Sequence, residues 1–236
     1  MARRGLVTGF SGWRAASALL AGVLVLAVVG LGAYFINVAA TRRTPSVTSA
    51  DCSTANFSAP LGPLDQPSNV HHYSKEPAFT IDPDRLYQAT IASPKGDIVI
   101  CLVPGWAPNT VNSFVTLIRN HFFEGLRWAR DPSTAPGGPV IQGGSPTSDL
   151  SGGPGYKFKD EKVVSPLYKS GAYQPGAVAM ANSGPNSNGS QFFITLSSFT
   201  LPASYNLFGE VTSGLNVAAL VKKGDLMDIT VREQLP

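Results

Sequence analysis

The sequence predicts an all-β domain that carries two isolated helices and is built as a closed barrel or a sandwich. From Leu86 to the C-terminus, short apolar runs alternate with clusters of turn-forming residues, which is typical of many short strands. Charged residues make up only 14% of the 236 residues, and the chain has 24 glycines and 19 prolines. This composition favours strands and turns over a helical bundle. The net charge of +3 comes without a block of basic residues, which argues against nucleic acid as a partner.

Seven apolar runs are expected to be strands, and two segments are expected to be helices. The clearer helix is 107–120, where Pro108 suits the first turn and apolar residues recur at helical spacing. A second helix is expected at 215–222, before Gly224. The expected strands are 87–92, 97–103, 139–142, 176–181, 190–196, 206–211 and 228–231.

The N-terminal part of the chain is expected to be a membrane anchor. Residues 15–41 carry no charge and are almost wholly apolar over 18–35, close to the roughly 20 residues that cross a bilayer as a helix. Arginines are slightly enriched before this span. This bias predicts a cytoplasmic N-terminus at 1–14, a single-pass anchor in the cell membrane at 15–40 and an extracytoplasmic remainder. The alternative is a signal peptide with a small-residue cleavage site at 38–40.

Residues 41–85 have the composition of a linker. They are rich in Ser, Thr, Pro, Asn and Asp and show no apolar periodicity. They are therefore expected to act as a spacer between the membrane and a domain at 86–236. The adjacent pair His71 and His72 falls in this segment and is interpreted as solvated rather than metal-binding.

The two cysteines exclude a disulfide scaffold and a cysteine-rich zinc site. Cys52 and Cys101 are able to pair if the domain lies outside the membrane, because disulfides persist in oxidising compartments. The preferred interpretation is a buried thiol at Cys101 and an exposed thiol at Cys52.

A long polar loop between two apolar runs is the first candidate site. Residues 182–190 are all Gly, Asn, Ser or Pro, and Gln191 follows them. Side-chain amides at the loop ends offer donors and acceptors to the backbone of a peptide. Phe192 and Phe193 are neighbours in a strand, so one faces a core and the other a groove. The alternative is a structural loop whose amides bond its own backbone.

Residues suited to acid–base or nucleophilic catalysis are scarce. His121 has no obvious partner, and 151–155 lacks the Lys and Ser/Thr of a phosphate loop and is interpreted as a surface turn. This scarcity suggests a reaction that makes no bond to the protein. Prolyl cis/trans isomerisation is such a reaction, with a barrier of about 20 kcal/mol that comes from amide resonance. It needs an arginine that donates to the prolyl nitrogen, an apolar pocket and amides for the flanking backbone.

The segment ANSGPNSNGSQFFI (181–194) resembles the signature of the cyclophilin-type peptidyl-prolyl isomerases nearly throughout. The resemblance runs from about Tyr87 to the C-terminus and is closest to actinobacterial membrane-anchored members. It implies an eight-stranded antiparallel closed barrel capped by two α-helices, without a metal or organic cofactor. It also implies X-Pro bonds in peptides or unfolded proteins as substrates.

The resemblance also assigns residues. In the family, a Tyr-Asp-Gly turn leads to Phe-His-Arg, and here FEG (123–125) leads to WAR (128–130). Arg130 thus resembles the catalytic guanidinium, although Ala129 replaces the usual His, and Arg127 is interpreted as a surface charge. The substrate-binding residues implied by the resemblance are Gln142, Val140, Ala181, Asn182, Gln191, Phe193, Leu201 and Tyr205.

Some positions depart from the family pattern. Pro139 and Val140 stand where the family has Phe-Met, which alters one wall of the proline pocket. The family's cyclosporin-contacting Trp has no clear equivalent, since either Thr200 or Leu201 occupies its place. These changes put affinity for cyclosporin in doubt.

The expected function is isomerisation of X-Pro bonds in extracytoplasmic or secreted proteins, with Arg130 donating a hydrogen bond to the prolyl nitrogen. The altered pocket wall motivates an alternative, a membrane-tethered module that binds proline-containing peptides with little or no turnover. A third hypothesis is a structural envelope protein, which would have no affinity for peptides.

Overall fold

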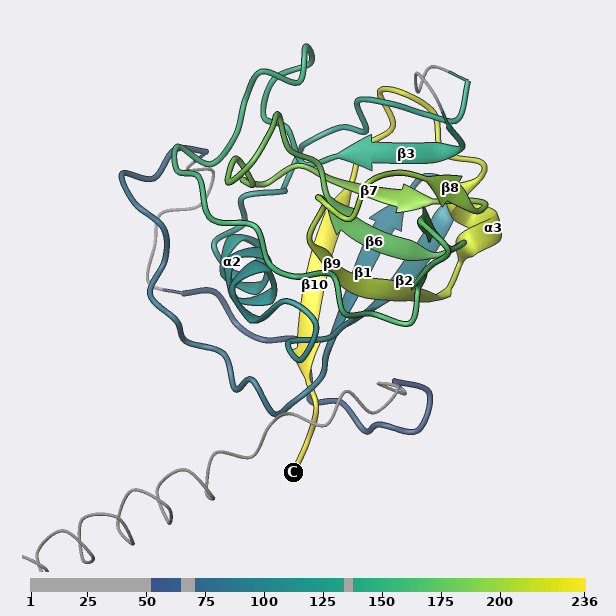
Figure 1. The fold of residues 1–236 in the computed structure, drawn as a ribbon. Coiled ribbons are helices and arrows are strands. Elements are labelled where there is room, and N and C mark those ends of the chain that lie inside the picture. The colour runs from purple at the N-terminus through teal and green to yellow at the C-terminus, as the bar shows by residue number, and fades with distance from the viewer. Residues whose placement is uncertain (1–51, 65–70, 134–137) are drawn as a thin grey trace, which may run out of the picture. The chain divides into compact units, whose positions relative to one another are not determined.

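The main sheet has seven strands, and each lies where an apolar run predicts one (Figure 1). The computed structural model describes residues 52–64, 71–133 and 138–236. The sheet order is β10-β1-β2-β9-β6-β7-β3, and all neighbours pair antiparallel. The strands are β1 (Tyr87–Ser93), β2 (Gly96–Leu102), β3 (Val140–Gly143), β6 (Ala177–Met180), β7 (Phe192–Thr195), β9 (Leu207–Ser213) and β10 (Asp228–Glu233).

Three further strands, which the sequence does not predict, form a small second sheet. They are β4 (Tyr168–Lys169), β5 (Ala172–Tyr173) and β8 (Phe199–Thr200), in the order β4-β5-β8. Two residues are too few to show the apolar alternation from which a strand is recognised.

The main sheet is curled, but its strands do not form the predicted closed ring of eight. Its edge strands are β10 and β3, and the irregular segment 126–130 links them. Trp128 N donates to the oxygen of Asp225, just before β10, at 2.9 Å, and Arg130 N donates to the oxygen of Gln142 in β3 at 3.1 Å. The segment makes single bridges to two different neighbours instead of a continuous ladder with one, so it does not count as a strand.

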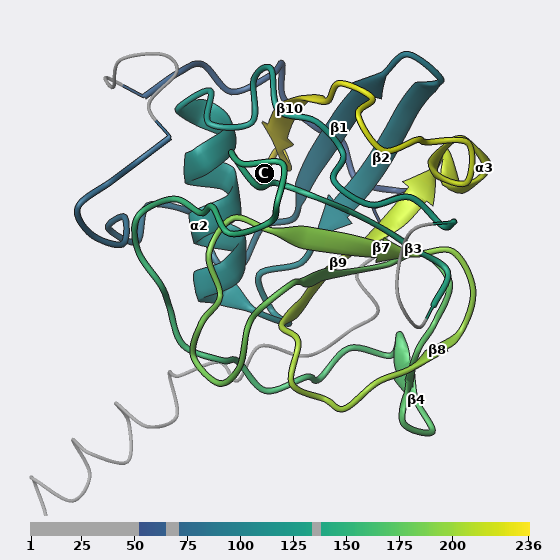
Figure 2. The same ribbon diagram turned by 90° about the horizontal axis from the view of Figure 1, so that it is seen from above.

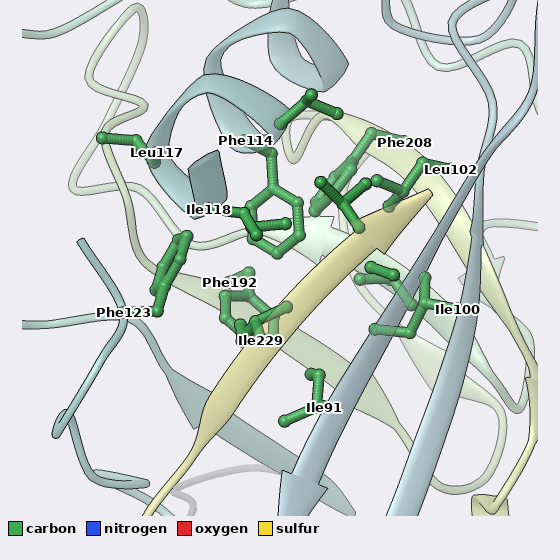
Figure 3. Packing of buried hydrophobic residues seen from close by; sticks show 14 of the residues in the cluster. Ile91, Ile100, Leu102, Phe114, Leu117, Ile118, Phe123, Phe192, Phe208 and Ile229 are labelled. Atoms are coloured by element: carbon green, nitrogen blue, oxygen red, sulfur yellow. The ribbon is translucent and has the colours of Figure 1, made fainter. Parts of the chain in front are cut away.

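The two helices of the described residues lie at opposite ends of the curled sheet in both views (Figures 1 and 2). α2 (Pro108–Arg119) confirms the predicted first helix and packs on β9 and β10. Its Phe114 lies among the apolar side chains of the strands (Figure 3). α3 (Leu215–Ala218) is shorter than predicted, because the next backbone bonds are of the tighter i→i−3 type, from Leu220 N to Val217 O and from Val221 N to Ala218 O.

The described parts of the predicted linker, 52–64 and 71–85, pack on the domain rather than standing apart from it. Leu61 N donates to Val231 O of β10 at 2.8 Å. Asn112 Oδ1 on α2 accepts from Thr80 N at 2.8 Å. This packing depends on backbone bonds and isolated side chains, which leave no periodic pattern in the sequence.

Cys52 and Cys101 form a disulfide. The preferred expectation of two free thiols is therefore wrong. Cys101 is in β2. The segments 52–64 and 71–85 are called the N-terminal extension from here on, and the first of them brings Cys52 beside Cys101 in a cluster with Val103 and Trp106. The pairing depends on the path of residues 52–64, which the sequence pattern does not reveal.

The predicted cytoplasmic N-terminus and anchor, 1–14 and 15–40, lie outside the described residues. In the described part of the chain, no helix has the length and apolarity needed to span a bilayer.

Candidate active site

Strand register places the predicted catalytic arginine in line with the predicted substrate-binding residues. Gln142 of β3 lies opposite Phe193 of β7, and Phe193 lies opposite Ala179 of β6. A single bridge adds Arg130 opposite Gln142. Because directly opposed residues of antiparallel strands project to the same face, Arg130, Gln142 and Phe193 share one face of the sheet.

The two faces of these strands serve different clusters. Ile141, Phe192 and Ile194 enter the main core, whereas Val140 and Phe193 belong to a second apolar cluster. Since side chains alternate along a strand, a two-residue pair such as Phe192 and Phe193 supplies both the core and the floor of a groove, as expected from the sequence.

A cavity of about 1110 Å³ lies over the second cluster. Every predicted site residue lines it: Arg130, Val140, Gln142, Ala181, Asn182, Gln191, Phe193, Leu201 and Tyr205. Leu201 lines it and Thr200 does not. The roles assigned to these residues remain predictions.

The side chain of Arg130 is half-buried at the cavity wall. Among the described residues it has neither a hydrogen-bond partner nor an ion-pair partner. Gln142 beside it donates from Nε2 to Oε1 of Gln191 at 3.0 Å. The N–H groups of the Arg130 guanidinium are therefore able to donate hydrogen bonds to a ligand in the cavity.

The two amides of the polar loop are already engaged within the protein. Gln191 Nε2 donates to the oxygens of Leu150 and Gly152, both at 2.8 Å, and Asn182 Nδ2 donates to Ser204 O at 2.8 Å. These donors bond backbone oxygens outside the loop 182–190, whereas the structural alternative expects bonds to the loop's own backbone. Both side chains still line the cavity, where they fix the walls.

Tyr173 is a buried residue beneath the cavity that the sequence analysis missed. Its hydroxyl donates to Tyr205 O at 2.8 Å, and its ring packs edge-on against Phe193. Burial raises the pKa of the Tyr173 phenol well above its usual value, so it stays a neutral donor. Tyr173 lies in β5, a strand of two residues that is too short to be recognised from the sequence pattern.

Two further wall segments were assigned to other roles in the sequence analysis. His71 and His72, expected to be solvated in a linker, line the cavity, and so do Ser151–Gly155 of the expected surface turn. The composition of both segments stands out in the sequence, but the sequence pattern does not show that they lie beside the cavity. In the described ranges, no three His, Cys, Asp or Glu side chains are grouped as metal ligands.

Comparison with known proteins defines the protein family to which this chain belongs. A profile of the family described as cyclophilin type peptidyl-prolyl cis-trans isomerase/CLD matches residues 87–234. The chain belongs to this family.

Individual relatives agree with this assignment. A probable peptidyl-prolyl cis-trans isomerase B of Mycobacterium leprae is 38% identical over 150 residues, which cover 58% of this chain and 49% of the relative. A peptidyl-prolyl cis-trans isomerase B of Streptomyces anulatus is 40% identical over 145 residues, which cover 55% of this chain and 78% of the relative. The chain thus spans about half the length of the mycobacterial relative.

A solved structure has the same fold. It is a cyclophilin type peptidyl-prolyl cis-trans isomerase of Cryptosporidium parvum, crystallised in the presence of the dipeptide Ala-Pro. The similarity has a TM-score of 0.53 at 27% identity and covers 61% of this chain and 98% of the other.

Proposed function

We propose that this chain is a peptidyl-prolyl cis-trans isomerase that acts on X-Pro bonds in peptides and unfolded proteins. The observation that carries the proposal is the Arg130 guanidinium, which has no partner among the described residues, on the wall of an apolar-floored cavity in a chain of the cyclophilin family. The proline ring would rest on the floor made by Phe193, Val140 and Leu201.

Arg130 would act by electrostatics. In the twisted transition state the prolyl nitrogen loses its amide resonance and gains a lone pair, which the planar ground state lacks. A guanidinium N–H aimed at this nitrogen therefore stabilises the transition state more than either isomer. Arginine is suited to this role because it remains charged across the physiological pH range.

The test compares Arg130→Ala with Arg127→Ala. Arg127 is three residues earlier, is exposed and donates to Gly224 O at 2.7 Å outside the cavity. We expect Arg130→Ala to lower kcat/KM by about 10²–10³-fold, the usual effect of removing one transition-state donor, and Arg127→Ala to retain activity. Exchange NMR on an Ala-Pro peptide measures both. Equal activity in the two variants would refute the role of Arg130.

A binding module with little turnover is the second candidate. Val140, in place of the family's usual residue, is 7% exposed and belongs to the floor cluster, so this wall of the pocket differs from the family pattern. NMR shift titration on the same samples separates the two functions. Peptide binding without exchange in the wild-type chain would favour the module.

We propose further that the domain acts outside the cell membrane on a single-pass anchor. The apolar span 15–40 and the Cys52–Cys101 disulfide support this setting, because structural disulfides belong to oxidising compartments. In cells that express the full chain, we expect the protein to stay with membranes in alkaline carbonate and the domain to be digested by protease added outside. Release by carbonate, or protection from the protease, would contradict this setting.

A further inference from the structure

The segment 71–73 precedes the family-matching region 87–234, yet its first two residues form part of the cavity wall. His71 and His72 line the cavity together with the loop 146–157. This chain therefore adds groups to the groove that the family domain alone does not contain.

The segment is held against the loop by several contacts. Tyr73 N donates to Pro154 O at 2.7 Å. The ring of His71 packs edge-on against Phe122, with centroids 5.3 Å apart. Gly155 has a φ of +90°, and a side chain there would collide with Tyr73 O and His72 Nδ1. A glycine at this position lets the imidazole of His72 lie directly on the loop.

A continuous series of hydrogen bonds connects this end of the cavity with Arg130. Arg130 N donates to Gln142 O at 3.1 Å, and Gln142 Nε2 donates to Gln191 Oε1 at 3.0 Å. Gln191 then donates to Gly152 O at 2.8 Å, two residues before Pro154. Arg130 and the loop that contacts His72 thus belong to one connected wall of the cavity.

Among the described residues, the cavity lining carries basic groups and no acidic one. Arg130, Lys157, His71 and His72 line it, and no Asp or Glu does. Within the described residues, none of these four forms an ion pair. Lys157 also borders a smaller hollow beside Glu76.

The carboxylate of Asp149 is in the same loop, outside the lining, and it accepts from the hydroxyl of Ser151 at 2.7 Å. Lys157 presents an ammonium group to the cavity, and the imidazole of His72 offers an N–H donor beside it.

We propose that His72, Gly155 and Lys157 form a specificity subsite that binds the carboxylate of an acidic residue near the proline of the substrate. The proposal rests on the isomerase function. The subsite favours Glu or Asp over a neutral residue of the same shape at one position of the bound chain. Exposed charge pairs contribute little in water, so the expected preference is about threefold in kcat/KM and falls with salt.

The experiment uses proline peptides of otherwise neutral sequence. Each carries a single Glu at one position, from three residues before the proline to three after, and each has a matched Gln peptide. Exchange NMR with the full chain in detergent gives kcat/KM, and shift titration gives affinity. We expect one position at which the Glu peptide exceeds its Gln partner about threefold in 20 mM salt and equals it in 1 M salt.

Variants of the protein then test which side chains cause the preference for the Glu peptide. In His72→Gln/Lys157→Gln the Glu-to-Gln ratio should fall to about one, and in Lys157→Glu it should fall below one. Lys95→Gln removes the same charge in the β1–β2 turn, away from the cavity, and should keep the wild-type ratio. Thermal unfolding confirms that each variant is folded.

A ratio near one at every position in the wild type, or a preference that survives in the double variant, would overturn the subsite. Failure of the isomerase function is distinguishable, because the neutral peptides would then show no exchange, while the affinity ratio would still report the subsite.

Discussion

Gly144 follows the last residue of β3 and contacts Ser190, the last residue of the polar loop 182–190. Its φ is +85°, a conformation that side chains other than glycine rarely adopt, and an added Cβ would collide with the backbone oxygen of Ser190. Ser190 Oγ in turn donates to Gly144 O at 2.6 Å. This contact fixes Gln142, two residues before Gly144, relative to Gln191, immediately after Ser190.

We therefore expect Gly144→Ala to destabilise the protein by at least about 2 kcal/mol, since it combines a strained φ with a backbone collision. Urea unfolding followed by tryptophan fluorescence measures the change. Gly105→Ala is the control, because Gly105 has no neighbour within 4 Å of an added Cβ, and its effect should stay within about 0.5 kcal/mol. A similar small effect in both variants would show that the loop adjusts without cost.

Single residues of the site were predictable where a motif carries them. All nine predicted residues line the cavity, and the direct pairing of β3 with β7 accounts for three of them, Val140, Gln142 and Phe193. The bonding state of those residues was not predictable. The donors of Asn182 are engaged by Ser204 O, a contact set by how two loops fold together rather than by any local spacing.

At the scale of elements, the N-terminal extension changes the environment of α2. The helix sequence is amphipathic, yet the polar residues Asn112, Ser113 and Thr116 are buried. Asn112 is covered because Thr80 bonds its side chain, and Ser113 because its hydroxyl bonds that of Tyr156. The extension and the 146–157 loop thus complete the burial of a helix that the sheet alone would cover on one face.

The disulfide ties the start of this extension to β2, across 49 residues of sequence. We expect Cys52→Ser to destabilise the protein by up to about 4 kcal/mol, because closing a loop of this length restricts the unfolded chain. Urea unfolding with and without dithiothreitol measures the effect. Reductant should shift the wild-type midpoint and leave that of Cys52→Ser unchanged, and an unshifted wild type would show that the bond contributes nothing.

Elements were predictable in proportion to their length. The seven longer strands were visible as apolar runs and α2 as a helical periodicity, whereas β4, β5 and β8 have two residues each and gave no signal. The link between the sheet edges could not be predicted for another reason. Arg130 bridges Gln142, and Arg127 bridges Leu226, so neighbouring residues of one segment bond to partners far apart in sequence.

At the scale of the whole molecule, two buried tyrosines join segments that are distant in the chain. Tyr87 at the start of β1 donates to Glu233 Oε1 at 2.9 Å, and Tyr173 donates to Tyr205 O at 2.8 Å beneath the cavity. Burial raises the pKa of both phenols above the usual value near 10. Both groups are therefore expected to keep their protons in the folded state at a pH where the unfolded chain releases them.

This difference predicts alkaline destabilisation. Below about pH 10, the unfolded and folded states bind the same number of phenol protons, and the contribution of both tyrosines to stability is fully present. Above it, the unfolded state holds fewer protons, so the free energy of unfolding should fall by about 1.4 kcal/mol per pH unit for each tyrosine. Urea unfolding between pH 9 and 11.5 measures the slope, and Tyr173→Phe should reduce it by one tyrosine. Stability that does not change over this range would show that the phenols titrate without unfolding, and an unchanged slope in Tyr173→Phe would assign the effect to other groups.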